Sequence, residues 1–326
     1  MRYVYASAFV SEIISYLDML SGAGRYIIGI QSSLRGLDNY LANNGMAQKA
    51  LDAESITAWV NTKDVSSLTK AKNVSHAKGF ARYLVSLGIE ASCPEGPRRH
   101  SEYVPYIFSD VELERIFSAA DNFEAGAKLT RTALIFPILL RLLYGCGLRL
   151  GEGCHLRWKD VDLAHGILTI RKAKNQKQRF VPMDVSTIRL LNDYRAMTNS
   201  DGICEDYLFE SDHSPGKPFH MNTFYGWFRK VMKTAGIQYT RRSRAERGPC
   251  PHCLRHCFTL KSFLKSEDEG RRFEDTSPFL AAYLGHEGPV ETEAYLRSNH
   301  TVYTQSHKRV DAALGCLFPE VSFDDE

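Results

Sequence analysis

The chain has 326 residues, with 41 lysines and arginines against 38 aspartates and glutamates. This length suggests two domains and excludes a single small module stapled by disulfides. The net charge of +3 is too small to draw in an acidic partner as a whole, so binding to nucleic acid would have to come from local basic clusters.

Cysteine usage and hydropathy indicate the cellular compartment. The eight cysteines are dispersed, and the N-terminus has no basic segment followed by an apolar run, which indicates a cytoplasmic protein with reduced thiols. The longest apolar run, ALIFPILLRLL, is interrupted by Pro137 and Arg141 and falls short of the roughly 18–20 residues of a membrane span. We therefore expect a soluble protein without membrane association.

The first segment, residues 6–88, has apolar side chains at helical spacing. The pattern predicts four amphipathic helices, the last of which ends at Gly88, a residue suited to a helix C-cap. We assign residues 1–92 to a helical domain. Its last helix also carries a basic set, which is either a solvated face or a contact to a phosphate backbone: Lys70, Lys72, Lys78 and Arg82.

Residues 93–105, CPEGPRRHSEYVP, combine three prolines and a glycine with Arg98 and Arg99, a composition that resists helix and strand. We place a linker here and a second domain over residues 106–326. Ser109 and Glu112 then have the spacing of a capping box, which predicts a helix start.

Residues 166–183, GILTIRKAKNQKQRFVPM, predict a β-hairpin with a polar tip. The rest of the second domain has helical patterns, so the expected fold class is mainly α with a small β-hairpin. Four basic residues lie on or beside the tip, where they either solubilise the turn or contact DNA: Lys172, Lys174, Lys177 and Arg179.

The segment GCGLRLGEG places Gly145 and Gly147 just before a short helical stretch on which Arg149 and Glu152 share a face. A carboxylate at that spacing can hold a guanidinium in position. The pair is either purely structural or part of an anion site.

Residues 249–257, PCPHCLRHC, allow two interpretations. Cys250 and Cys253 have C-x-x-C zinc spacing, and His256 or Cys257 could add a ligand. On a helix that starts near His252, a polar face formed by His252, Arg255, His256 and Thr259 would instead grip an anion, with Leu254 and Phe258 on the opposite, apolar face. We favour the anion site, since no second ligand pair lies at ordinary spacing and an arginine would repel the metal.

Downstream, YLGHEGPVETEAYLRSNH supplies His286 in a Leu-Gly-His turn and Tyr295 in a short helical stretch. Before it, residues 265–277, KSEDEGRRFEDTS, read as a long charged loop that contacts a neighbour or DNA. The C-terminal segment carries an apolar stripe at Val310, Leu314 and Leu317, which is buried against its own domain or against another subunit.

These motifs, in this order, resemble the tyrosine recombinases, or phage integrase family. GLRLGE, a basic hairpin ending in RFVPM, HCLRH, YLGH and a tyrosine at the usual interval all match over residues 106–300. The resemblance implies a catalytic set of Arg149, Lys174, His252, Arg255, His286 and Tyr295, with Glu152 orienting Arg149.

The resemblance also implies a mechanism. The two arginines would clamp the phosphate with help from His252 and His286, while Tyr295 would form a 3′-phosphotyrosine and Lys174, with Lys172 and Lys177 as neighbouring alternatives, would protonate the leaving oxygen. No cofactor, metal or ATP is expected. Besides the residues of the last helix, linker and hairpin, the expected DNA contacts include Arg241, Arg242 and Arg244.

For the whole chain, the resemblance implies an N-terminal SAM-like core-binding domain that forms a clamp around DNA with the catalytic domain. The expected partners are double-stranded DNA, further copies of the chain in a tetrameric synaptic complex, and accessory DNA-bending proteins. The expected function is site-specific recombination that integrates, excises or resolves a mobile element or replicon. A type IB topoisomerase-like relaxing enzyme and a noncatalytic zinc or DNA-binding module are the alternatives.

Overall fold

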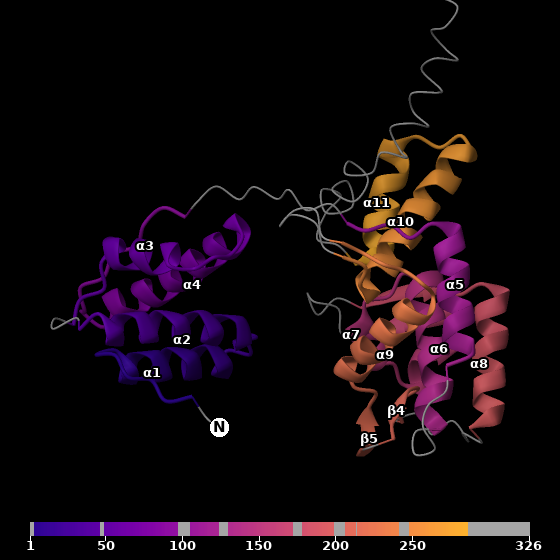
Figure 1. Cartoon of the computed structure of the whole chain (residues 1–326), viewed down its shortest axis with the longest axis horizontal. Helices are drawn as coiled ribbons and strands as arrows, with labels where there is room; N and C mark the ends of the chain where they lie inside the picture. The colour runs from indigo at the N-terminus through magenta and orange to yellow at the C-terminus, as the bar shows by residue number, and fades with distance from the viewer. Residues whose placement is uncertain are drawn as a thin grey trace, which may run out of the picture. The chain divides into compact units, whose positions relative to one another are not determined.

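The computed structural model describes residues 3–45, 49–96, 105–123, 130–171, 178–198, 206–212, 214–240 and 248–285. The chain divides into two compact units, Met1–Glu102 and Tyr103–Glu326, a division that falls within residues 93–105. Both are mainly helical, and the second also holds two small sheets (Figure 1). The expected fold class, mainly α with a small β-hairpin, is confirmed. Among the described residues, no helix combines the length and apolar character that a bilayer span requires.

The first unit contains the four predicted helices, α1 (Val10–Gly22), α2 (Ile28–Asn43), α3 (Ala53–Asn61) and α4 (Ser67–Ser86). Their apolar stripes meet in one core, in which Leu34, Leu37, Trp59, Ala77 and Phe80 are at most 1% exposed. Because α4 packs on the other three helices, it is the central element of this unit (Figure 1).

Gly88 ends α4 as predicted. Its φ of 78° is left-handed, and two backbone hydrogen bonds close the end of the helix: from Gly88 N to the Val85 carbonyl and from Ile89 N to the Leu84 carbonyl, both 3.0 Å. These two bonds form a Schellman motif. Along the helix, Lys72, Lys78 and Arg82 are exposed, whereas Lys70 is half-buried.

The second unit is organised around α6 (Thr130–Gly145), whose residues Ile135, Phe136, Leu139 and Leu140 are fully buried. Five helices contact it directly or pack beside it (Figure 1). They are α5 (Asp110–Asp121), α7 (Leu150–Cys154), α8 (Val185–Met197), α9 (Met221–Thr234) and α10 (Pro251–Asp268), and α11 (Phe273–Leu284) lies beside α10.

The larger sheet has three antiparallel strands in the order β1 (Val161–Asp162), β2 (Ile167–Ile170) and β3 (Arg179–Pro182). Strands β2 and β3 are those of the predicted hairpin, and its tip, residues 172–177, lies outside the described residues. A short 3-10 helix (Trp158–Asp160) precedes the sheet, and β4 (Glu210–Ser211) with β5 (Ser214–Pro218) forms a second, two-stranded sheet.

The charged segment 265–277 was expected to be a loop, and this prediction is wrong. Helix α10 continues to Asp268, and α11 begins at Phe273 after a tight turn at Gly270, whose φ is 83°. Glutamate and lysine are good helix formers, so a dense run of charges does not oppose a helix. The turn is closed by hydrogen bonds from Gly270 N to the Glu267 carbonyl and from Arg271 N to the Ser266 carbonyl.

The capping box at the start of α5 is present as predicted, and its contribution to stability can be tested. The Ser109 hydroxyl accepts from Glu112 N at 3.3 Å, and the Glu112 carboxylate accepts from Ser109 N at 2.8 Å. Ser109→Ala removes one cap, so we expect the free energy of unfolding to fall by about 1 kcal/mol. Ser118→Ala, on the exposed side of the same helix, is the control for urea unfolding; equal effects of the two changes would contradict a capping role.

Candidate active site

Arg149 and Glu152 form an ion pair at the start of α7, as the sequence predicted. Arg149 is the N-cap residue with extended backbone (φ −72°, ψ 144°), and Glu152 is the third residue of the helix. The carboxylate accepts from the Arg149 backbone N and from its Nη1, both at 2.9 Å. One carboxylate therefore caps the helix and orients the guanidinium.

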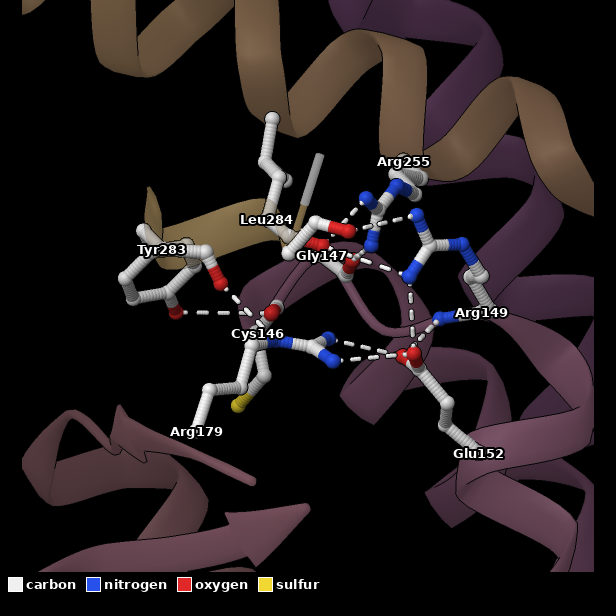
Figure 2. A network of polar contacts seen from close by, with 9 residues as sticks. Cys146, Gly147, Arg149, Glu152, Arg179, Arg255, Tyr283 and Leu284 are labelled. Carbon is white, nitrogen blue, oxygen red and sulfur yellow. Dashed lines mark hydrogen bonds and ion pairs between the residues drawn. The ribbon is translucent and has the colours of Figure 1, made fainter. Parts of the chain in front are cut away.

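Arg179, which was expected to contact DNA, is a second partner of Glu152. Strand β3 directs its side chain inward, leaving it 9% exposed. Its Nη1 and Nη2 donate to Oε1 and Oε2 of Glu152 at 2.9 and 2.7 Å, so the guanidinium and the carboxylate form a two-pronged pair (Figure 2). Because both prongs are occupied, this side chain holds the site together instead of facing solvent.

The charge of Glu152 depends on these two arginines. Burial by itself would raise the pKa of this carboxyl, but the hydrogen bonds and positive charges of Arg179 and Arg149 outweigh burial and lower the pKa to about 2. Glu152 is therefore a carboxylate at neutral pH and supplies a permanent negative charge between two guanidiniums.

The C-terminal end of α11 accepts hydrogen bonds from three arginines. Arg179 Nε donates to the Tyr283 carbonyl at 2.9 Å, and Arg255 Nη2 donates to the Leu284 carbonyl at 2.7 Å. Arg149 donates to the carbonyls of Leu284 and Gly285 at 3.4 and 3.2 Å. Figure 2 shows these side chains converging on the helix end. A helix C-terminus has unsatisfied carbonyls and partial negative charge, so cations suit this position.

Arg255 lies one turn into α10 and is 1% exposed. Its Nη1 donates to the Gly147 carbonyl at 2.7 Å, so it links the glycine turn before α7 to the end of α11. Both faces of α10 are enclosed in this stretch, because His256 and Thr259 are buried together with Leu254. Donation from Nη1 and Nη2 to backbone carbonyls offsets part of the cost of burying this arginine.

The turn before α7 requires a glycine at the position of Gly147. Its φ of 58° is left-handed, and a Cβ at this position would lie 2.5 Å from Cδ1 of Phe258. Phe258 in turn stacks on Tyr283, with ring centroids 5.3 Å apart. The close approach of turn and helix therefore depends on the missing side chain.

His252 occupies the first turn of α10 and is exposed, one helical turn before Arg255. Its ring lies 4.6 Å from that of His256, edge to face.

Cys253 and Cys257 are buried, as predicted. Over the described ranges, no three histidine, cysteine, aspartate or glutamate side chains come together in a way that could hold a metal ion.

The electrostatic character of the cluster follows from its composition. Arg149, Arg179 and Arg255 bring three positive charges, and Glu152 brings one negative charge. The surplus of positive charge is suited to a phosphate group, since guanidinium forks bind two oxygens at once. Arg149 is the most accessible of the three, with 25% of its side chain exposed.

Several predicted site residues lie outside the described residues. His286 follows Gly285 directly in the chain, so its attachment point is the arginine-bound end of α11. The others are Lys174, Tyr295, Lys172, Lys177, Arg98, Arg99, Arg241, Arg242 and Arg244.

The role of Arg179 had a signal in the sequence. Residues alternate between the two faces of a strand, so the predicted strand in RFVPM puts Arg179 on the same face as Val181; in the structure Val181 is buried while Phe180 is 64% exposed. Arg179 therefore shares the inner face with Val181. The carbonyl acceptors of residues 283–285 had no such signal, because backbone acceptors do not depend on side-chain type.

Comparison with known proteins agrees with this geometry. Residues 107–301 match the sequence model of the Phage integrase family. A "putative integrase/recombinase y4rB" of Sinorhizobium fredii is 28% identical over 320 residues, covering 94% of this chain and 98% of that protein.

Two solved structures share the fold. The XerH site-specific recombinase, in a post-cleavage complex with palindromic difH substrate, has a TM-score of 0.66 at 17% identity and covers 94% of this chain and 90% of XerH. A lambda integrase tetramer bound to a Holliday junction has a TM-score of 0.61 at 16% identity and covers 86% and 78% of the two chains.

The Gly147 turn leads to a stability prediction. We expect Gly147→Ala to lower the free energy of unfolding by about 2 kcal/mol or more, because it adds a left-handed alanine and a clash with the Phe258 ring. Gly151→Ala, where a Cβ would meet only Met221 Sδ at 3.6 Å, is the matched control and should be close to neutral. Urea unfolding compares them, and a neutral Gly147→Ala would contradict the tight approach.

The Glu152 ion pairs lead to a pH prediction. The lowering of its pKa from 4.5 to about 2 corresponds to about 3 kcal/mol of stability. A depressed carboxyl pKa stabilises the fold above pH 4.5, and that contribution disappears as the pH falls towards 2. The difference in unfolding free energy between wild type and Glu152→Gln should therefore be full at neutral pH and shrink below pH 4.5.

Urea unfolding at a series of pH values measures this difference, with the exposed Glu114→Gln as control. A difference that stays constant across the acid range would show that the Glu152 charge does not contribute.

Proposed function

The chain belongs to the phage integrase family, the tyrosine recombinases that cleave and rejoin DNA, and we propose that Tyr295 is the nucleophile with which it does so. The observation that carries the proposal is the arginine cluster around Glu152, which is bonded to the helix end that leads into His286. A phosphodiester cleaved at this cluster would be handled by residues of this chain in the following roles.

Arg149 and Arg255 would bind the nonbridging oxygens of the scissile phosphate. Negative charge grows on these oxygens as the attacking oxygen adds to phosphorus, so fixed positive groups stabilise the transition state more than the ground state. Each guanidinium carries five N–H donors, and Arg149, with 25% of its side chain exposed, is the more accessible of the two. Glu152 and Arg179 would be positioning residues, since Glu152 holds Arg149 and Arg179 holds Glu152.

Attack by the Tyr295 hydroxyl on phosphorus would form a 3′-phosphotyrosine and release the 5′-oxygen of the next nucleotide. The phosphoester bond is conserved in this exchange, so resealing needs no nucleotide cofactor. Lys174 would donate the proton to the leaving oxygen. His252 would donate a hydrogen bond to the phosphate from the start of α10, and His286 from the second residue after α11.

Further DNA contacts would come from basic residues outside the cluster. In the first unit, Lys72, Lys78 and Arg82 are exposed on α4. This basic surface supports the assignment of residues 1–92 as a core-binding domain. We propose that residues 1–92 and 106–326 engage the same duplex as a clamp. Arg179 is omitted from this contact set, because its guanidinium is committed to Glu152.

Recombination, as opposed to simple relaxation, requires strands from two DNA sites to be exchanged among several protomers. The lambda integrase structure with which this chain shares its fold is a tetramer on a Holliday junction. We propose the same assembly for this chain, with the apolar stripe of the C-terminal segment, Val310, Leu314 and Leu317, docking on a neighbouring subunit.

Covalent trapping tests the nucleophile. Wild-type protein, incubated in EDTA with DNA from around its own gene, should form an adduct that survives a denaturing gel, and Tyr295→Phe should form none. Tyr303→Phe is the matched control, and it should retain the adduct. If the adduct persists in Tyr295→Phe and is lost in Tyr303→Phe, the nucleophile is Tyr303 and the assignment is wrong.

The oligomeric state on DNA tests the role of the C-terminal segment. Deleting residues 306–326 should reduce the DNA-bound species from a tetramer to smaller complexes, while binding of one protomer to a single half-site continues. Light scattering of the complexes on a full-length site measures this. An unchanged stoichiometry after the deletion would contradict the proposed docking.

A further inference from the structure

The start of α10 contains a pair of cysteines to which the cleavage mechanism assigns no role. Cys250 is the N-cap residue, Pro251 opens the helix, and Cys253 is its third residue. The two sulfur atoms lie 3.6 Å apart, and Cys250 N donates to Cys253 Sγ at 3.4 Å. His252, a proposed phosphate ligand, lies between them in the same turn.

The two thiols differ in their access to solvent. Cys250 is half-buried, whereas Cys253 is fully buried. The hydrogen bond with Cys250, together with burial, raises the pKa of Cys253. Cys250 is therefore the thiol that a small disulfide can reach, and it lies at a helix N-terminus, where backbone N–H groups and the helix dipole favour negative charge. One reachable thiol beside one enclosed thiol is an arrangement suited to disulfide exchange.

Other cysteines in the described part of the second unit have different surroundings. Cys257, one turn further along α10, accepts a hydrogen bond from Phe108 N at 3.2 Å and is buried. Cys146 and Cys154 are also buried, and burial raises the pKa of both to about 12. They are suited to packing and not to exchange.

We propose that Cys250 and Cys253 form a reversible disulfide on contact with a low-molecular-weight disulfide, and that this oxidation slows DNA cleavage. The Cys250 thiolate attacks one sulfur of the small disulfide, which releases one thiol and leaves a mixed disulfide on Cys250. Cys253 Sγ, losing its proton to solvent, then attacks Cys250 Sγ and releases the second thiol. The protein loses two electrons and two protons, and the small disulfide is reduced to two thiols.

The two sulfur atoms are close enough to form a disulfide only if they first move closer together. A disulfide has its sulfur atoms about 2.05 Å apart, so the present separation of 3.6 Å has to close by roughly 1.5 Å. Cys253 is enclosed in the core, where displacement is costly. The shift therefore falls mainly on Cys250 and on the turn that carries Pro251 and His252.

The effect on cleavage rests on the proposed function of His252. A displacement of about 1 Å at a reacting centre can cost on the order of 100-fold in rate. We expect oxidised protein to cleave DNA at least about 10-fold more slowly than reduced protein, with full recovery on reduction.

The disulfide is tested first, without reference to activity. Trypsin releases residues 248–255, GPCPHCLR, as a peptide that holds both cysteines, whereas Cys257 falls in the next peptide, residues 256–261. Full-length protein is incubated with oxidised glutathione in EDTA, blocked with an alkylating agent and digested. We expect this peptide to lose the mass of two hydrogen atoms and to resist alkylation. Two alkylated cysteines, or a stable glutathione adduct on Cys250, would overturn the proposal.

The coupling to cleavage is tested with Cys250→Ser, since serine also serves as a helix N-cap. Single-turnover adduct formation is compared before and after oxidation, in wild type and in this variant. We expect slowing in wild type only; equal slowing in both, or a disulfide without slowing, would overturn the coupling. If reduced wild-type protein forms no adduct, the proposed function is wrong. The peptide mass would still show whether the disulfide forms.

Discussion

The buried carboxylate of Glu152 is the interaction on which the active-site cluster depends. Three guanidiniums repel one another, and taking one of them out of water is costly unless it is paired. Glu152 offsets two of them, and the carbonyls at the end of α11 bind all three. With the carboxylate present, the cluster is stable and still carries surplus positive charge for a phosphate. Without it, Arg149 and Arg179 would repel each other across a desolvated site.

The same contacts explain how segments far apart in the chain come to act together. The turn at Gly147, the strand at Arg179, the helix at Arg255 and the end of α11 are separated by up to 138 residues, from Gly147 to Gly285, and all are tied together by arginine side chains (Figure 2). Long, planar side chains with several donors are suited to this task, since one residue can contact two or three elements. Arginine therefore acts here as a structural linker as well as an anion ligand.

Much of the fold could be predicted from the sequence because it rests on local signals. Apolar periodicity predicted the four helices of the first unit, the Ser109–Glu112 spacing predicted a helix start, and the Arg149–Glu152 spacing predicted an ion pair. The contacts that the sequence did not predict are non-local. Arg179 has its partner 27 residues away, and the polar residues of α10 are buried by packing against α6 and α11. The loop prediction for residues 265–277, by contrast, is a local error, because glutamate, lysine and arginine are good helix formers.

The anchoring of α11 through backbone carbonyls has a consequence for how the site tolerates sequence change. The acceptors at Tyr283, Leu284 and Gly285 belong to the peptide chain, so substitutions of these side chains remove none of them. Alanine scanning of this segment would report packing and turn geometry and would leave the anchor undetected. The connection that holds the segment leading to His286 therefore does not depend on the side chains of Tyr283 and Leu284, whereas Gly285 is fixed by its left-handed φ of 68°.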